Sequence, residues 1–305
     1  MEIYDDQRGR DELITYKKLS ELSIEDVIAL WNRSFEEYLV NITMTVTTFL
    51  RRVVIEDLSL EHSFAAYVDG QPVGIVVNGF RQVNGDKVGW NGGTAIVPEH
   101  RGKGLGLILM QENIERYRRE GVQIALLEAI SENERAIKLY RNVGYTIEDQ
   151  LTFMNTSGDL PEDVFGSSDP NGRYTIKRGM ARDIRAFPFH KPLAAWQTQW
   201  PSVKDGESII IFDGTEAVGY ALYKQVYDDS GNLTMISLYQ CEALPGHQDQ
   251  DAILRLALHE VYRPHSFSCR RITVNLSKSN EVVIRALTDA GFEKQVDLVH
   301  MKKMI

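Results

Sequence analysis

Residues 101–106 read RGKGLG and combine two cationic side chains with three glycines at alternate positions. A strand-like pattern precedes this stretch, and a helical pattern follows it through Leu107, Met110, Ile114 and Tyr117. Glycine lacks a Cβ atom, so the backbone N–H groups of such a loop can approach a ligand closely. The start of a helix adds unpaired N–H groups and a partial positive charge. The stretch therefore predicts a diphosphate cradle, with an ordinary glycine-rich turn as the alternative.

Other binding and catalytic motifs fit the sequence poorly. A Walker loop ends in Gly-Lys-Ser/Thr, whereas Gly104 is followed by Leu105 and Gly106. A dinucleotide-binding fingerprint requires a small residue at position 109, which is Leu109. The seven histidines form no cluster with the spacing of metal ligands, and no Ser-His-Asp pattern is present. We therefore expect no metal site.

A second informative stretch, residues 131–145, has the pattern of a helix. Ser131 and Glu134 have the spacing of a capping box. An apolar face follows with the spacing i, i+3, i+4 and i+7, formed by Ala136, Leu139, Tyr140 and Val143. Tyr140 is therefore either a core residue or, beside a phosphate loop, a group that can take part in catalysis.

The two stretches together resemble the GNAT superfamily of N-acetyltransferases. The pattern Arg/Gln-x-x-Gly-x-Gly/Ala, after a strand and at the head of a helix, is the acetyl-CoA pyrophosphate motif of that family. Residues 94–110, TAIVPEHRGKGLGLILM, look like its fourth strand, pyrophosphate loop and third helix. Residues 133–145, NERAIKLYRNVGY, look like its cofactor-proximal helix. The resemblance extends over residues 11–155 and implies the mixed α/β fold of the family.

The resemblance also implies acetyl-CoA as co-substrate and gives roles to particular residues. The backbone of Ile96 and Val97 would pair with the pantetheine arm, and Asn133 would hydrogen-bond the same arm. Tyr140 would protonate the departing CoA thiolate, and the N–H of Val97 would polarise the thioester carbonyl. The implied cofactor-binding set is Ile96, Val97, Arg101, Gly102, Lys103, Gly104, Leu105, Gly106, Asn133 and Tyr140.

One expected part of the site is missing. Many family members carry a catalytic glutamate on the fourth strand, but residues 90–93 read WNGG. The group that deprotonates the incoming ammonium is left open between a water chain and the side chains of Glu36, Glu37 and Glu128. Glu128 interrupts an apolar strand, where an unpaired carboxylate would be costly. For each glutamate, a solvated or structural role is the alternative.

The chain also contains an internal repeat. Residues 97–110 resemble residues 244–257, at an offset of 147 residues (244 − 97). Residues 133–145 resemble residues 280–292 at the same offset (280 − 133), which indicates a duplicated α/β domain. A stretch rich in Gly, Pro, Ser and Asp separates the copies. Within 305 residues we predict two tandem GNAT-like domains with mixed sheets: a catalytic domain (1–155), a linker (156–172) and a degenerate domain (173–305).

The second copy keeps the residues that folding requires and loses the cofactor motif. Its loop carries Gln248, Asp249, Asp251 and Ile253 in place of Arg101, Gly102, Gly104 and Gly106. Two carboxylates would repel a diphosphate. Leu287 replaces Tyr140, while the buried face persists as Val283, Ala286, Leu287 and Ala290. We expect an inactive copy that packs on the first. The aromatic-rich residues 187–201 are expected at the interface, around a pocket, or in ordinary core and loop packing.

Charge and composition restrict the partners. The net charge of −9 argues against a nucleic-acid partner and weakly favours a cationic substrate. The composition, 43% hydrophobic and 25% charged, is typical of a globular protein, and we expect no membrane span. Cys241 and Cys269 lie in apolar stretches, which predicts buried thiols in a reducing cytoplasm. The acidic N-terminus lacks the apolar core of a signal peptide.

These observations predict a cytoplasmic N-acetyltransferase that moves the acetyl group of acetyl-CoA to a primary amine by direct attack in a ternary complex. A small cationic molecule is the favoured acceptor, and an amine of a peptide or protein is the alternative. A non-catalytic acyl-CoA sensor is the competing hypothesis. Whether the protein is a monomer or a homodimer is left open.

Overall fold

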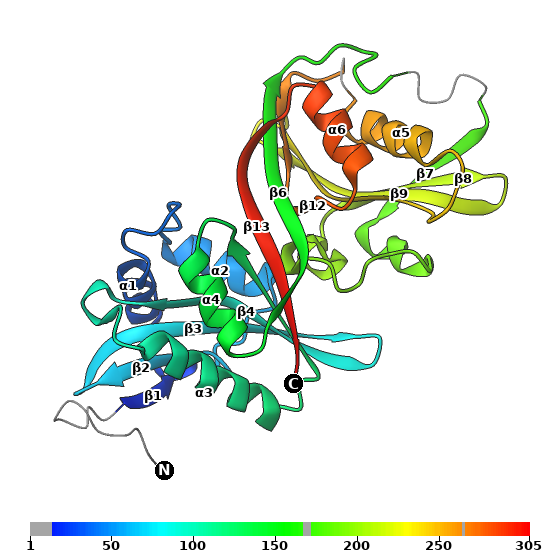
Figure 1. The fold of residues 1–305 in the computed structure, drawn as a ribbon. Helices are drawn as coiled ribbons and strands as arrows, with labels where there is room; N and C mark the ends of the chain where they lie inside the picture. The colour runs from blue at the N-terminus through cyan, green and yellow to red at the C-terminus, as the bar shows by residue number, and fades with distance from the viewer. Residues whose placement is uncertain (1–13, 167–171, 264–265) are drawn as a thin grey trace.

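A computed structural model describes residues 14–166, 172–263 and 266–305. These residues form two lobes that share one mixed sheet of 13 strands (Figure 1). The strand order is β1-β2-β3-β4-β5-β13-β6-β11-β10-β9-β8-β7, and β12 pairs with β6. The predicted fold class, a mixed α/β sheet, is confirmed by this arrangement.

The N-terminal half builds the first five strands and four helices. Its strands are β1 (Ile14–Lys18), β2 (Phe64–Val68), β3 (Gln71–Val83), β4 (Asp86–Ile96) and β5 (Ile124–Ile130). Its helices are α1 (Ile24–Ser34), α2 (Val46–Ile55), α3 (Leu105–Arg119) and α4 (Glu134–Asn142), with short 3-10 turns η1 (Leu19–Glu21) and η2 (Pro98–His100). The side chain of Ser23 caps α1 by accepting the Asp26 N–H at 3.1 Å.

The C-terminal half repeats much of this order. Its strands are β7 (Tyr174–Met180), β8 (Glu207–Asp213), β9 (Glu216–Tyr227), β10 (Leu233–Ala243), β11 (Cys269–Thr273) and β12 (Leu276–Ser277). Its helices are α5 (Gln250–Tyr262) and α6 (Glu281–Asp289). Where the first half has α1 and α2, it has the 3-10 turns η3 (Ala181–Ala186), η4 (Trp196–Thr198) and η5 (Trp200–Val203).

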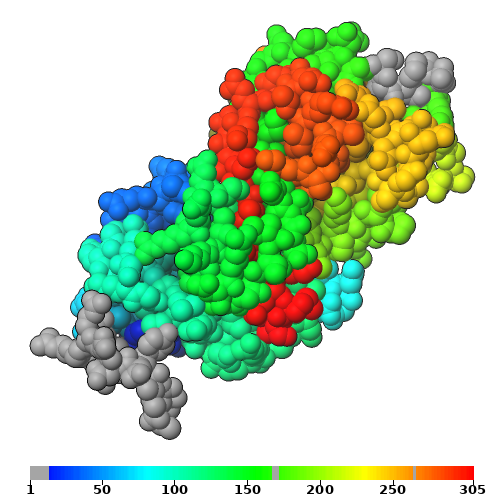
Figure 2. Space-filling model, in the orientation of Figure 1, coloured from blue at the N-terminus to red at the C-terminus, as the bar shows by residue number. Residues whose placement is uncertain are grey.

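The two halves exchange strands at the centre of the sheet. β13 (Glu293–Met304), the last strand of the chain, pairs with β5 and so completes the sheet of the N-terminal half. β6 (Thr146–Gly158) pairs with β11 of the C-terminal half, and β6 and β13 also pair with each other. Both strands run side by side between the lobes in Figure 1, and in Figure 2 red C-terminal residues emerge among the green residues of the N-terminal half.

This exchange modifies the predicted domain limits. The two packing units do not coincide with residues 1–155 and 173–305, because each unit contains a strand from the other half. The predicted linker, residues 156–172, begins inside β6, and Leu160 and Phe165 are buried in the C-terminal core. Residues 167–171 of that linker lie outside the described residues. Local composition does not reveal these limits, because strand pairing depends on residues that are far apart in the chain.

A tryptophan from the C-terminal half completes the core of the N-terminal half. The indole of Trp196 stacks on Trp90 of β4, with ring centroids 5.3 Å apart. The Arg81 guanidinium lies 3.9 Å from the opposite side of the Trp196 ring system. A Cβ atom on Gly79 would stand 3.2 Å from this indole, so the glycine makes room for it. The aromatic-rich residues 187–201 therefore contribute to the interface between the halves, which is one of the places predicted for them.

Candidate active site

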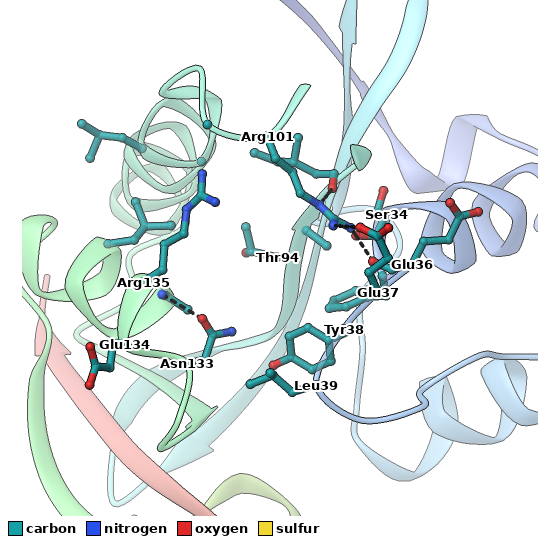
Figure 3. A pocket seen from close by; sticks show the side chains of 18 of the residues that line it. Ser34, Glu36, Glu37, Tyr38, Leu39, Thr94, Arg101, Asn133, Glu134 and Arg135 are labelled. Atoms are coloured by element: carbon teal, nitrogen blue, oxygen red, sulfur yellow. Dashed lines mark hydrogen bonds and ion pairs between the residues drawn. The ribbon is translucent and has the colours of Figure 1, made fainter. Parts of the chain in front are cut away.

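The site of the N-terminal half lies where two parallel strands diverge. The pairing of β4 with β5 ends at Asn91 and Leu127. Beyond this point a cavity of about 720 Å³ opens between the end of β4, the loop after α1 and the first turns of α3 and α4 (Figure 3). Six of the predicted cofactor-binding residues line it: Ile96, Arg101, Gly102, Gly104, Gly106 and, at the far wall, Asn133.

The glycine loop has the backbone that its sequence requires. Gly102 and Gly104 have φ angles of +80° and +84°, a left-handed conformation that side chains with a Cβ rarely adopt. Gly104 is the N-cap of α3, so helix geometry leaves the N–H groups of Leu105 and Gly106 without a partner in the helix, whereas the Leu107 N–H donates to the Gly104 carbonyl at 3.0 Å. A Cβ on Gly106 would lie 3.2 Å from Leu139 Cδ2, which would narrow the cradle.

Arg101 builds the wall of the cavity. Its Nε donates to the Ile96 carbonyl at 3.0 Å, and its Nη2 donates to the carbonyls of Ser34 and Glu36 at 3.2 and 2.6 Å. The guanidinium thus fastens the loop after α1 to the end of β4 and points away from the opposite wall (Figure 3). The two other predicted residues of the loop do not line the cavity: Leu105 is buried in the core and the Lys103 side chain is exposed.

Arg135 provides a cation that the sequence analysis missed. It lies in the first turn of α4, lines the cavity, and has Nη2 3.7 Å from the position of a Cβ on Gly102. In Figure 3 its guanidinium extends toward the glycine loop. A cation in the first turn opposes the helix dipole, and this unfavourable placement was the available sequence signal. No group of metal-binding side chains is found among the described residues.

Asn133 and Tyr38 face each other across the inner part of the cavity (Figure 3). Asn133 Oδ1 accepts the Ala136 N–H at 3.1 Å and so caps α4. The helix therefore begins one residue after Asn133, and the predicted capping box of Ser131 and Glu134 is wrong. The Asn133 side chain faces the Tyr38 phenol, and burial raises the pKa of that phenol. Tyr38 was not identified from the sequence, because no motif includes it.

Tyr140 is buried beside this region. It is 8% exposed and packs edge to face on Tyr145, but it is not among the residues that line the cavity, whereas its neighbour Leu139 is. Burial and the nearby Tyr38 phenol raise the pKa of Tyr140 well above its ordinary value. The phenol is therefore protonated at neutral pH, which is the state a proton donor requires.

The oxyanion role expected of Val97 is wrong. The Val97 N–H donates to the Val73 carbonyl at 3.0 Å, so it faces β3. In an antiparallel ladder successive peptide groups point to opposite sides, which turns Ile96 and Thr94 toward the cavity. The Ile96 carbonyl, which accepts from Arg101, follows this alternation. The sequence identified the correct strand but not which of its alternate residues faces the cavity.

Glu128 has a structural environment. Its side chain is 5% exposed, and its carboxylate accepts from Trp90 Nε1 at 2.7 Å, the Trp196 N–H at 3.0 Å and His300 Nδ1 at 3.0 Å. A carboxylate held by three donors and absent from the cavity lining is unsuited to act as the base. Glu36 and Glu37, the other two candidates, both line the cavity.

His300 connects the exchanged strand to this carboxylate. Its Nδ1 faces Glu128 Oε1 at 3.0 Å, and its Nε2 faces the Leu193 carbonyl at 3.1 Å. Both partners are acceptors, so both ring nitrogens donate and the ring is an imidazolium. Burial alone would lower the pKa of His300, but the hydrogen bond to Glu128 outweighs it and the pKa is raised. The pair joins β5 to β13 and to the segment before η4.

Sequence comparison agrees with this geometry. A model described as the acetyltransferase (GNAT) family matches residues 24–145. This match spans 122 of the 305 residues, all of them in the N-terminal half. No curated protein sequence matches the chain.

Solved structures extend the GNAT likeness to the whole chain. A GCN5-related N-acetyltransferase from Sphaerobacter thermophilus has a TM-score of 0.62 at 15% identity, covering 95% of both chains. A tandem GNAT protein from the clavulanic acid biosynthesis pathway has a TM-score of 0.59 at 11% identity, covering 96% of this chain and 98% of that one.

A glucosamine N-acetyltransferase region in a fungal multi-domain protein has a TM-score of 0.67 at 11% identity; the match covers 98% of this chain but only 39% of that one. At such identities these likenesses show the fold alone. No helix in the described part of the chain is long and apolar enough to cross a membrane.

Proposed function

We propose that this protein is an acetyl-CoA-dependent N-acetyltransferase whose working site is the cavity of the N-terminal half. The observation that carries the proposal is the open divergence of β4 and β5, with a glycine cradle and Arg135 at its outer part and Tyr38 and Asn133 facing each other across its inner part. A diphosphate fits the cradle, because left-handed glycines and a helix start leave N–H groups accessible and Arg135 adds a positive charge.

The chemistry requires few groups from the protein. Acetyl-CoA supplies the acetyl thioester, and the neutral amine attacks its carbonyl carbon, forming the C–N bond as the C–S bond breaks. N–H groups of Thr94 and Ile96 stabilise the developing oxyanion. Tyr140 donates a proton to the departing sulfur, and water or a rim carboxylate, Glu36 or Glu37, removes one proton from the nitrogen.

The acceptor that we propose is a small cationic primary amine. Two carboxylates at the rim, Glu36 and Glu37, and the net charge of −9 favour a positively charged molecule. Amines of peptides or proteins are the alternative. A cytoplasmic location, acetyl-CoA as the preferred acyl donor, and a monomeric or homodimeric state belong to the same proposal.

A non-catalytic acyl-CoA sensor is the second candidate function. Two observations favour it: Trp90 occupies the part of β4 in which many GNAT enzymes carry a glutamate, and Tyr140 does not line the cavity. Such a protein would bind acyl-CoA without transferring the acyl group.

The test measures CoA release from acetyl-CoA over a panel of amines. Tyr140→Phe should lower kcat about a hundredfold or more while leaving the Kd for CoA unchanged. Tyr145→Phe is the matched control, because its buried hydroxyl has no hydrogen-bond partner among the described residues and its ring contacts Tyr140. Acetyl-CoA that raises Tm without any amine-dependent CoA release would favour the sensor.

A further inference from the structure

A second cavity, of about 380 Å³, lies between the two halves. It is bounded by β6 and β13, the two exchanged strands, by β10 and β12, and by the segment before η4 (Figure 1). Its volume is within the range of small-molecule sites, and such sites favour the junctions between domains.

This cavity occupies a defined place in the C-terminal half. The pairing of β10 with β11 ends at Leu238 and Thr273, and the residues that follow on both strands line the cavity. The acetyl-CoA cavity proposed for the first half lies at the same divergence of strands. Cys241 packs into the core beneath α5 and α6, so by strand alternation Glu242 faces the opposite side, toward the N-terminal half.

Two carboxylates from different halves face this space. Glu242 of β10 has a side chain that is only 13% exposed, and Lys191 Nζ lies 2.9 Å from its carboxylate. Asp149 of β6 accepts from Ser277 Oγ at 2.5 Å. Burial raises the pKa of Glu242 even with Lys191 beside it, and the negative charge of Asp149 raises it further. The Glu242 carboxylate is therefore incompletely compensated by its surroundings.

The cations that line the cavity are already engaged. Lys191 pairs with Glu242, and Lys302 pairs with Glu148 at 2.7 Å. The imidazolium of His300 pairs with Glu128. Asp149 has no lysine or arginine partner in the parts of the chain that the structure describes. The lining itself carries three carboxylates and, with His300 protonated, three cations; because His300 pairs with Glu128, which lies outside the lining, one carboxylate, that of Asp149, is left over. A partly buried anion of this kind gains free energy from a cation.

We propose that this cavity binds a small organic ammonium ion, held between Glu242 and Asp149. The ammonium group lies between the two carboxylates, and the apolar part of the ligand contacts Pro192, Leu193 and Leu276. The degenerate half thereby keeps a ligand site on one face of its sheet after the loss of the cofactor loop on the other. The site requires no acetyl-CoA, so it is independent of the acetyltransferase proposal.

The test is calorimetric titration of the full chain with 1,4-diaminobutane, without acetyl-CoA. Glu242→Gln and Asp149→Asn should each weaken binding at least about tenfold, because each removes one charge-assisted contact. The neutral analogue 1,4-butanediol should not bind. Glu148→Gln is the matched control: it lines the same cavity but already pairs with Lys302, so its Kd should stay within about twofold of wild type.

A second set of variants excludes the N-terminal cavity as the source of the signal. Glu36→Gln and Glu37→Gln, which alter its rim, should at most remove a separate binding step at the proposed acceptor site and should leave unchanged the Kd of the step that Glu242→Gln and Asp149→Asn weaken. Thermal unfolding without ligand confirms that each variant folds. The proposal is overturned if the wild-type protein binds the diamine and the diol equally, or binds neither. It is also overturned if Glu242→Gln and Asp149→Asn both fold and retain wild-type affinity, or if the rim variants abolish binding.

Discussion

The loops that open α3 and α5 occupy equivalent places in the two halves, and their backbones show why only one suits a diphosphate. The first has Gly102 and Gly104 in left-handed conformations beside Arg135. In the second, the cap of α5 is Asp249, which has an ordinary φ of −104° and pairs with Arg173 at 2.7 Å. The second loop thus has its own anions, and neighbouring arginines neutralise them.

The two halves also differ in the space behind each loop, which is open in the first half and filled in the second. Ile253, which replaces Gly106, is fully buried, and a Cβ on Gly219 would stand 2.4 Å from it, so the position of the cradle is filled. Asn280 Nδ2 donates to the Cys241 carbonyl at 2.7 Å and bridges α6 to β10. Its counterpart Asn133 instead faces Tyr38 across an open cavity. The same fold therefore accommodates an open cofactor cradle in the first half and a filled one in the second.

The largest expected effect comes from separating the halves. Residues 1–158 and 159–305, expressed apart, should show no cooperative thermal unfolding, whereas their co-expression should restore it. Without β13, the facing edges of β5 and β6 lose their backbone partners, and the buried side chains of Val299 and Met301 leave the N-terminal core. Circular dichroism during heating measures this. Cooperative unfolding of residues 1–158 alone would contradict the strand exchange.

Next in size is the transfer of one residue between the loops. Gly106→Ile, which copies Ile253, should weaken CoA binding about a hundredfold by displacing two charge-assisted contacts to the diphosphate. Titration calorimetry measures the Kd. The reciprocal variant Ile253→Gly should destabilise the protein by about 2–5 kcal/mol without creating a second CoA site. CoA binding that survives Gly106→Ile would mean that this cavity is not the cofactor site.

A smaller effect is expected from the buried pair of Glu128 and His300. The repeat places Asn275 and Phe153 at the equivalent positions (128 + 147 and 300 − 147), so the C-terminal half lacks this charge pair. Because the pKa of His300 is raised in the folded state, its stabilisation is complete below the unfolded pKa of about 6.5 and is lost as pH rises through the folded pKa.

His300→Gln should therefore lower the free energy of unfolding by about 3 kcal/mol at pH 6 and by progressively less at higher pH. Urea unfolding from pH 5.5 to 9 measures the difference. His190→Gln is the matched control, because His190 hydrogen-bonds to the Phe187 carbonyl and not to a carboxylate. An equal loss at every pH would show that His300 does not carry a proton in the folded protein.

The smallest effect belongs to the acidic loop. Asp251 is half exposed and pairs with Arg255 at 2.7 Å and with Arg285 at 3.3 Å. Asp251→Asn should change the free energy of unfolding by less than about 1 kcal/mol, and by less in high salt, because exposed ion pairs are screened. Urea unfolding at two salt concentrations measures it. If this variant bound CoA, the negative charge of the loop alone would explain why the second half does not bind it.

Several features were predictable because they are local. The repeat, the glycine loop and the helix that follows it depend on neighbouring residues, and glycines with positive φ can be anticipated where a strand turns into a helix. The loss of the cradle in the second copy was also visible, since Asp249, Asp251 and Ile253 stand where a diphosphate requires glycine. The prediction from local sequence was wrong at the start of α4, where the N-cap is Asn133 and not Ser131.

Other parts of the site depend on residues that are far apart in the chain. Tyr38 reaches Asn133 from the loop after α1, and no motif joins them. Val97 was assigned the oxyanion role because a motif identifies a strand but not the side toward which each peptide group points. Glu128 could be recognised as an unusual residue on an apolar strand, but its partners Trp196 and His300 follow it by 68 and 172 residues.

The sequence by itself determined the repeated α/β order, the resemblance of the first half to the GNAT family and the loss of the cofactor loop in the second, because each follows from residue type at fixed spacing. Only the tertiary structure decided that β6 and β13 exchange places, that Trp196 completes the opposite core, and that Glu242 and Asp149 meet in one cavity. The physical reason is that strand pairing and side-chain burial minimise the free energy of the whole chain. The residues that pair in this way are more than a hundred positions apart, as β5 and β13 or Trp90 and Trp196 show.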